Sequence, residues 1–136
     1  MSATAITSVA TVFIAAFVAI IGFNQWRISR DKLRLDLFNR RFDVYLRVLD
    51  YYQEVLKGEG VPSDSITTPF IKAVRESRFI FPKASGVHQF LEEFRYRADK
   101  FAKNIIPRRD GDFAWINDAM PTLETMMEPY VKFEKL

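Results

Sequence analysis

The chain has 136 residues, near the usual size of one domain, and its 49% hydrophobic and 27% charged residues are ordinary for a folded protein. This composition excludes a largely disordered chain. The absence of cysteine excludes disulfides and thiolate catalysis, and a single histidine, His88, leaves little for a histidine-based metal site. No charged side chain precedes Arg27, so we expect an apolar leading segment followed by a charge-rich body.

The apolar leading segment, residues 3–23, predicts a transmembrane helix. It consists mainly of Ala, Val, Ile and Phe, and about 20 such residues in a helix cross a hydrocarbon core of roughly 30 Å. The alternatives are a cleaved signal peptide, which would need a basic segment before the run, and a buried helix of a soluble protein. We expect a retained anchor over residues 1–26, with its membrane interface at Trp26, Arg27, Arg30, Lys32 and Arg34.

Charge asymmetry predicts the orientation of this span. Basic residues outnumber acidic ones between Arg27 and Arg47, and none precedes the span. Since cytoplasmic flanks carry the excess of Lys and Arg, we expect the body in the cytoplasm and the short amino-terminal end outside.

Small residues recur every three or four positions along the span. In lipid, such residues let helix backbones approach closely, and hydroxyl groups can add hydrogen bonds between helices. The alternative is that small residues are merely tolerated in an anchor that faces lipid. The pattern predicts a homo-oligomer that packs through Thr4, Ser8, Thr11, Ala15, Ala19 and Gly22.

The body, residues 27–136, reads as an all-α bundle, because apolar residues repeat with helical spacing and no stretch alternates with period two. No Gly or Pro falls between Phe23 and Lys57, so one long helix is expected to run from the membrane to about residue 57. Thr68 as N-cap with Pro69 in the first turn predicts the next start, and Pro121 predicts a kink or two short helices in the last segment. The expected later helices cover about residues 68–81, 85–106 and 112–133.

The segment from Lys32 to Tyr45, KLRLDLFNRRFDVY, resembles a widespread group of small bacterial single-span membrane proteins with a KLRLDLF-x-RRF-x-VY-like segment after the span. Two shorter stretches also fit, Arg78–Phe81 before a helix and Pro129–Phe133 at the end. The chain departs from the group at Asn39, where an acid is expected, and at Pro82, where Gly is common. The resemblance implies a bacterial inner-membrane protein with a helical bundle, and it brings no activity with it.

Two sets of charges in the body are candidate sites. Arg40 and Arg41 belong either to a solvated stalk with compensating charges or to a set of bonds that reach carboxylates and loop carbonyls of later helices. A third interpretation is an anionic-ligand site. A second basic set forms a candidate anion-binding surface, consisting of Lys72, Arg75, Arg78, Arg108 and Arg109. With a net charge of only +3 and no nucleic-acid-binding motif, we expect a solvated face or attraction to anionic lipid rather than a nucleic-acid partner.

The sequence contains no clear signature of a catalytic site. His88 and Glu92 are four residues apart, but the simplest interpretation is a pair on a helix surface, since no nucleophile signature or phosphate loop accompanies them. We expect no enzyme, no cofactor and no metal site.

Two function classes therefore remain. The first is a membrane-anchored, self-associating scaffold or accessory subunit whose cytoplasmic helical domain binds another protein. The second is a membrane sensor-effector whose cytoplasmic domain binds an anionic signal, such as a cyclic nucleotide, and perturbs the membrane. A large exposed apolar patch would favour the first class, and basic groups that converge in space would favour the second.

Overall fold

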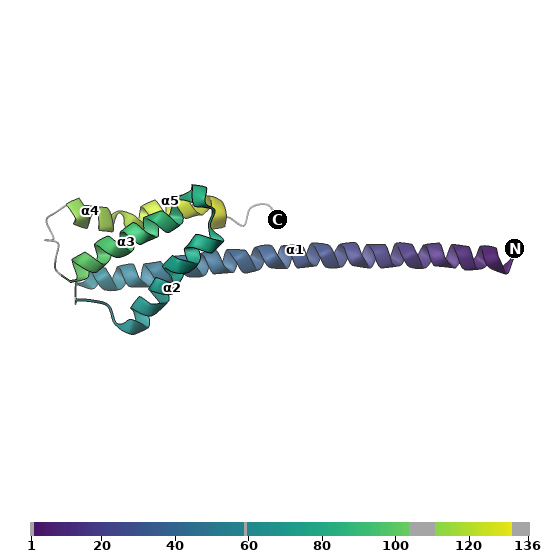
Figure 1. Ribbon diagram of the computed structural model, residues 1–136, viewed down its shortest axis with the longest axis horizontal. Coiled ribbons are helices and arrows are strands. Elements are labelled where there is room, and N and C mark those ends of the chain that lie inside the picture. The colour runs from purple at the N-terminus through teal and green to yellow at the C-terminus, as the bar shows by residue number, and fades with distance from the viewer. Residues whose placement is uncertain (1, 59, 104–110, 132–136) are drawn as a thin grey trace. The chain divides into compact units, whose positions relative to one another are not determined.

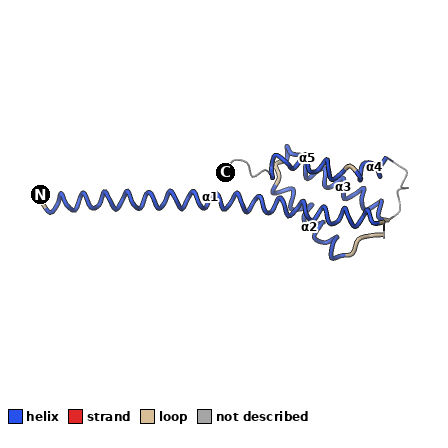
Figure 2. The backbone as a smooth tube through the Cα atoms, turned by 180° about the vertical axis from the view of Figure 1, so that it is seen from behind, coloured by secondary structure: helices blue, strands red, loops and turns tan. Residues whose placement is uncertain are grey.

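The computed structural model describes residues 2–58, 60–103 and 111–131 of the chain. Every regular element in these ranges is a helix, so the predicted all-α fold is confirmed (Figure 2). The chain divides into two units, the first ending at Asp36 and the second running from Leu37 to Lys135. The two units are described separately below.

Helix α1, Ala3–Lys57, contributes to both units. It ends where the sequence predicts, because Gly58 adopts a left-handed conformation with φ 71° that terminates the helix. The amide of Gly58 donates to the carbonyl of Val55 at 3.2 Å and so satisfies one of the last carbonyls of α1.

The first unit consists of the amino-terminal part of α1. None of its described side chains is buried, although an 18-residue window of this helix reaches a mean hydropathy of 2.4. Among the described residues, α1 is the one helix long and apolar enough to cross a membrane. Its apolar residues are therefore not covered by any other part of the chain that the structure describes.

The second unit contains the rest of α1, the helices α2, Asp64–Ile80, and α3, Val87–Ala102, and the helices α4, Gly111–Asn117, and α5, Ala119–Val131. A short 3-10 turn, η1, Lys83–Ser85, precedes α3. Helix α3 packs against α2, α4 and α5 (Figure 1). Rings join α1 to this group, because Tyr51 stacks on Phe70 of α2 with centroids 4.0 Å apart.

Helix α2 begins earlier than Thr68, so the predicted N-cap is wrong. Ser63 occupies the N-cap position in an extended conformation, and Asp64 supplies an acidic residue to the first turn. Pro69 consequently lies inside the helix rather than in its first turn. The helix ends at Ile80, just before Pro82, as the sequence predicts.

The later helices also differ from their predicted bounds. Helix α3 starts at Val87 rather than residue 85, because Gly86 takes the left-handed conformation with φ 71° at its N-cap. Its predicted end at residue 106 lies outside the described residues. The last segment forms two helices, as expected, but the break falls at Asp118. Pro121 lies in the first turn of α5, where its missing amide costs no helical hydrogen bond.

The core of the second unit lies between its helices. Phe94 of α3 packs edge-on against both Tyr51 and Phe70, at centroid distances of 6.3 and 5.9 Å. The largest fully buried side chains come from all five helices and include Val44, Val48, Phe70, Leu91, Phe94, Ile116, Leu123 and Met127. Burial on α1 thus begins at Val44 and continues to Val55.

Candidate functional site

The predicted membrane-interface residues lie exposed on the first unit. Trp26 is 56% exposed, and the guanidinium of Arg30 lies 5.0 Å from the centroid of its ring. Arg27, Lys32 and Arg34 are also exposed. An exposed indole under a cation is the arrangement that favours the boundary between lipid and water.

The predicted self-association stripe is exposed along its whole length, but two of its three hydroxyl groups are already bonded. Ser8 donates to the carbonyl of Thr4 at 2.9 Å, and Thr11 donates to the carbonyl of Thr7 at 2.8 Å. These bonds within the helix use the protons that cross-helix bonds would need. Any association through Ala15, Ala19 and Gly22 therefore rests on close packing alone.

Arg41 joins α1 to the ends of two other helices. Its Nε donates to the carbonyl of Ile80 at 2.8 Å, and its Nη1 donates to the carbonyl of Tyr130 at 3.1 Å. The guanidinium also lies over the rings of Phe81 and Tyr130, at 5.4 and 5.6 Å from their centroids. Of the sequence alternatives for Arg40 and Arg41, the carbonyl-binding one is therefore right for Arg41, whereas Arg40 is exposed.

The two acceptors explain why a guanidinium is placed here. Ile80 is the last residue of α2, and Tyr130 is the penultimate residue of α5, so both carbonyls lie at the negative ends of helix dipoles. Burial lowers the pKa of Arg41 from its ordinary value, and the interaction with Tyr130 partly opposes that shift. Arginine remains charged nonetheless, so the group acts as a fixed cation that caps two helices.

The predicted anion-binding residues are brought together only in part. Lys72, Arg75 and Arg78 are exposed on α2, and Arg108 and Arg109 lie outside the described residues. Arg78 lines a pocket of about 220 Å³ together with Lys83 and His88.

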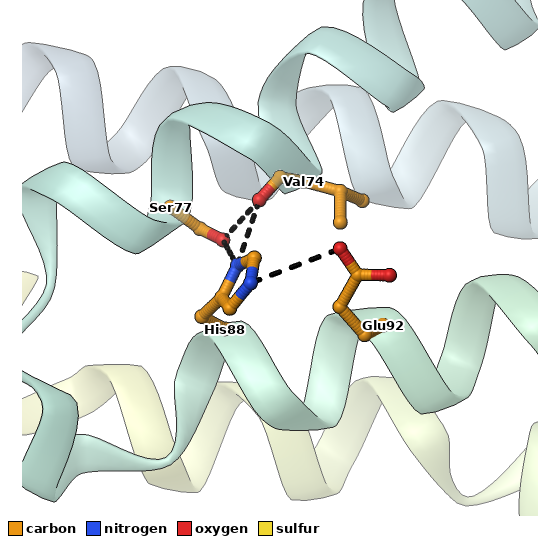
Figure 3. A network of polar contacts seen from close by, with 4 residues as sticks. All are labelled: Val74, Ser77, His88 and Glu92. Atoms are coloured by element: carbon orange, nitrogen blue, oxygen red, sulfur yellow. Dashed lines mark hydrogen bonds and ion pairs between the residues drawn. The ribbon is translucent and has the colours of Figure 1, made fainter.

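His88 is more closely tied to the fold than a surface pair would be. Its Nδ1 lies 3.1 Å from the carbonyl oxygen of Val74 and 3.1 Å from Oγ of Ser77, both on α2 (Figure 3). Since a carbonyl only accepts, Nδ1 carries the proton, and in the neutral ring Nε2 bears the lone pair. Nε2 faces Oε1 of Glu92 at 3.7 Å, a contact that becomes an ion pair only when the ring is protonated. The expected surface pair is therefore a link between α2 and α3.

A groove with apolar walls lies between α1 and α5 of the second unit. Its volume is about 470 Å³, and its lining residues are Phe42, Tyr45, Pro121, Glu124, Thr125, Met127, Glu128 and Val131. The hydroxyl of Tyr45 donates to Oε1 of Glu124 at 2.7 Å across the groove. This hydrogen bond is the main reason that the pKa of Tyr45 is raised to about 12.

The sequence did not identify this groove. Phe42 and Tyr45 lie on an apolar face of the long helix that the spacing shares between the core of the bundle and a partner, and Phe42 is 43% exposed. The opposite wall of the groove is formed by α5. Its position depends on where α5 begins and on how α5 is rotated about its own axis, and the spacing of apolar residues in the last segment defines neither. The one sequence feature that could have indicated the groove is the mixture of polar and apolar residues on this face of α5, namely Pro121, Glu124, Met127 and Glu128.

Among the described residues, no group of three or more His, Asp or Glu side chains is placed to hold a metal ion. Comparison with known proteins finds no match to any family model, curated protein or solved structure. A function for this protein must therefore be inferred from its own sequence and structure.

Proposed function

We propose that the protein is a membrane-anchored, self-associating scaffold or accessory subunit whose helical body binds other chains at the cytoplasmic face of a bacterial inner membrane. The first unit supports the anchor, since its apolar side chains are uncovered and an exposed apolar surface of this extent needs lipid or protein around it. The basic residues that follow Trp26 support the cytoplasmic placement of the body.

The observation that carries the docking role is the groove between α1 and α5. Phe42, Met127 and Val131 give it apolar walls, and Glu124 supplies a carboxylate. An occupant with apolar residues flanked by basic ones would complement this surface.

A second copy of the chain supplies such an occupant. The segment over residues 27–36 carries Arg27, Arg30, Lys32 and Arg34 beside Ile28, Leu33 and Leu35, and its apolar residues are exposed. Copies anchored in one membrane also face each other at a raised effective concentration. The proposed contact is therefore between the basic segment of one copy and the groove of its neighbour.

Because the chain contains no cysteine, disulfide trapping can test this contact without background. Two differently tagged copies are expressed together, one with Leu33→Cys and the other with Thr125→Cys in the groove. Mild oxidation in membranes should yield a mixed disulfide dimer, since a disulfide requires Cα atoms within about 7 Å. Gln53→Cys, an exposed position of α1 outside the groove, is the matched control in place of Thr125→Cys.

Equal trapping of Thr125→Cys and Gln53→Cys would show that the dimer forms by random collision. Trapping of Thr125→Cys to a different protein, with no dimer, would assign the groove to another partner and overturn self-docking. The orientation has its own test, because a reporter fused to the carboxyl terminus should report the cytoplasm.

The sensor-effector alternative has one observation in its favour, the pocket of about 220 Å³ at Arg78, Lys83 and His88. Titration of the solubilised protein with inorganic phosphate tests it. Binding that is lost with Arg78→Gln and kept with Arg75→Gln would favour this function over the scaffold.

A further inference from the structure

A second cavity, distinct from the groove, lies between α2 and α3. Its volume is about 440 Å³, within the range of roughly 300–1,000 Å³ that small-molecule sites occupy. It is lined by Tyr51, Thr67, Phe70, Ile71, Glu92, Arg95, Tyr96, Asp99 and Lys103. These residues combine an apolar wall with hydroxyl groups and charges of both signs.

One of the hydroxyl groups that line this cavity belongs to Tyr51. The side chain of Tyr51 is only 3% exposed, and its ring is fixed between Phe70 and Phe94. Its hydroxyl forms no hydrogen bond with any residue that the structure describes, and no described side-chain oxygen is both fully enclosed and unpaired, so this oxygen is open to the cavity that Tyr51 lines. A hydroxyl in this position can bond a polar group of a bound molecule.

The surroundings of Tyr51 keep its hydroxyl protonated. Burial raises the pKa of Tyr51 to about 12, with a further contribution from Asp99 and an opposing one from Arg95. Both charged residues line the same cavity. The hydroxyl therefore stays protonated at neutral pH and can either donate or accept a hydrogen bond within the cavity.

Some charged groups around the cavity form no ion pair with another described residue. Lys103 and Asp99 neutralise each other through a contact of 3.0 Å. Arg95 forms no ion pair with any described residue, and Glu92 has only the 3.7 Å contact with His88, which is charged only if that ring is protonated. One guanidinium and one carboxylate, three residues apart on α3, thus remain to be complemented.

We propose that this cavity binds a small zwitterionic molecule with an apolar ring, an amino-acid-like ligand. Its anionic group pairs with Arg95, its ammonium group pairs with Glu92, and its ring packs against the wall of Phe70 and Ile71. The hydroxyl of Tyr51 bonds the polar end. A ligand with only one charge leaves either Arg95 or Glu92 desolvated without a partner, which costs affinity.

Three probes that share one ring test the requirement for both charges. L-Phenylalanine carries a carboxylate and an ammonium group, 2-phenylethylamine lacks the carboxylate, and 3-phenylpropanoate lacks the ammonium group. Equilibrium dialysis with the full chain in mild detergent should show L-phenylalanine binding about tenfold tighter than either of the others, the effect of one charge-assisted hydrogen bond.

Substitutions then assign each contact. Arg95→Gln should weaken L-phenylalanine and 3-phenylpropanoate about tenfold and leave 2-phenylethylamine unchanged, whereas Glu92→Gln should do the reverse. Tyr51→Phe should weaken L-phenylalanine severalfold without lowering the melting temperature, since the hydroxyl supports nothing in the fold. Arg75→Gln, on the exposed face of α2, is the control and should bind as the parent does.

The proposal is overturned if the three probes bind equally, if none binds, or if Arg95→Gln and Tyr51→Phe bind L-phenylalanine like the parent. A fall in melting temperature with Tyr51→Phe would assign the hydroxyl a structural role and remove its place in the site. Glu92→Gln keeps the test decisive should Arg95→Gln fail to fold.

Discussion

Helix α1 runs through two regions that treat its apolar residues in opposite ways. In the first unit, Phe13 and Phe17 are 71% and 66% exposed, and no described side chain is buried. In the second unit, Val44 and Val48 of the same helix are almost completely buried. Helix formation is therefore common to both regions, and what differs is whether the described chain covers the apolar side chains.

The sequence pattern explains this difference. Apolar residues surround the helix on all sides in the first unit, which is typical of a segment that lies in lipid. In the second unit they are confined to a wide face, which is typical of a helix packed on others. Side chains of the first unit should accordingly contribute to association within the membrane, and those of the second to the stability of the fold.

Truncation of a large side chain in each region should separate these two contributions most strongly. Phe94→Ala removes a fully buried ring that contacts Tyr51 and Phe70, and we expect it to lower the free energy of unfolding by about 3–5 kcal/mol. Phe17→Ala removes an exposed ring of the same size and should leave the body unchanged. Urea denaturation in mild detergent, followed by near-UV circular dichroism, measures both.

If Phe17→Ala destabilised the body as much as Phe94→Ala, the first unit would be part of the folded core. The division between the two regions would then be wrong.

The adjacent residues Arg40 and Arg41 allow an exposed side chain and a hydrogen-bonded one to be compared within a single turn of α1. Arg41→Ala leaves two helix-end carbonyls without their charged donor, and we expect a loss of about 2–3 kcal/mol. Arg40→Ala removes an exposed cation and should change the free energy of unfolding by less than about 0.5 kcal/mol. Thermal melts of both variants provide the measurement.

Arg41→Lys adds a further control, because an ammonium group cannot reproduce the planar fork that reaches both carbonyls. Full recovery with lysine would show that charge alone, and not the two directed hydrogen bonds, holds the helix ends.

Arg41 also shows how far the sequence could predict the site. Helical spacing was sufficient for the helices and for the end of α1, since these depend on local pattern and on Gly58. The acceptors of Arg41 are backbone carbonyls of Ile80 and Tyr130, and a carbonyl has no sequence signature. Only the packing of three helices brings these groups together.

The error at Thr68 has a related cause. A Ser or Thr before a proline is a good sign of a helix start, but Ser63 followed by Asp64 is an equally good one. The choice between them depends on contacts of the first turn of α2, including the bond from the hydroxyl of Thr67 to the carbonyl of Pro62 at 3.1 Å. Such contacts are not visible in the spacing of apolar residues.

Alkaline pH should weaken the second unit through Tyr51. The folded pKa of about 12 lies above the ordinary value of 10.0, so this contribution to stability is complete below pH 10 and is lost as the pH rises toward 12. The loss amounts to about 1.4 kcal/mol per pH unit in that window. Tyr51→Phe should flatten the dependence, and urea denaturation at pH 9, 10 and 11 measures it.

Tyr45 has a similarly raised pKa, so some dependence on pH should persist in Tyr51→Phe. Identical pH dependence in the parent and in Tyr51→Phe would mean that Tyr51 titrates as an exposed phenol, contrary to its burial.

The smallest expected effect concerns association of the first unit. Because the hydroxyls of Ser8 and Thr11 are bonded to their own helix, packing of small side chains is the main remaining attraction along this stripe. Ala15→Leu and Ala19→Leu prevent close approach and should reduce the cross-linked oligomer severalfold in membranes. Phe13→Leu and Phe17→Leu, on the bulky face of α1, should cross-link like the parent. The reverse result would place the contact on the bulky face, and no change in any of the four would leave association to the second unit, where the groove between α1 and α5 provides the alternative contact.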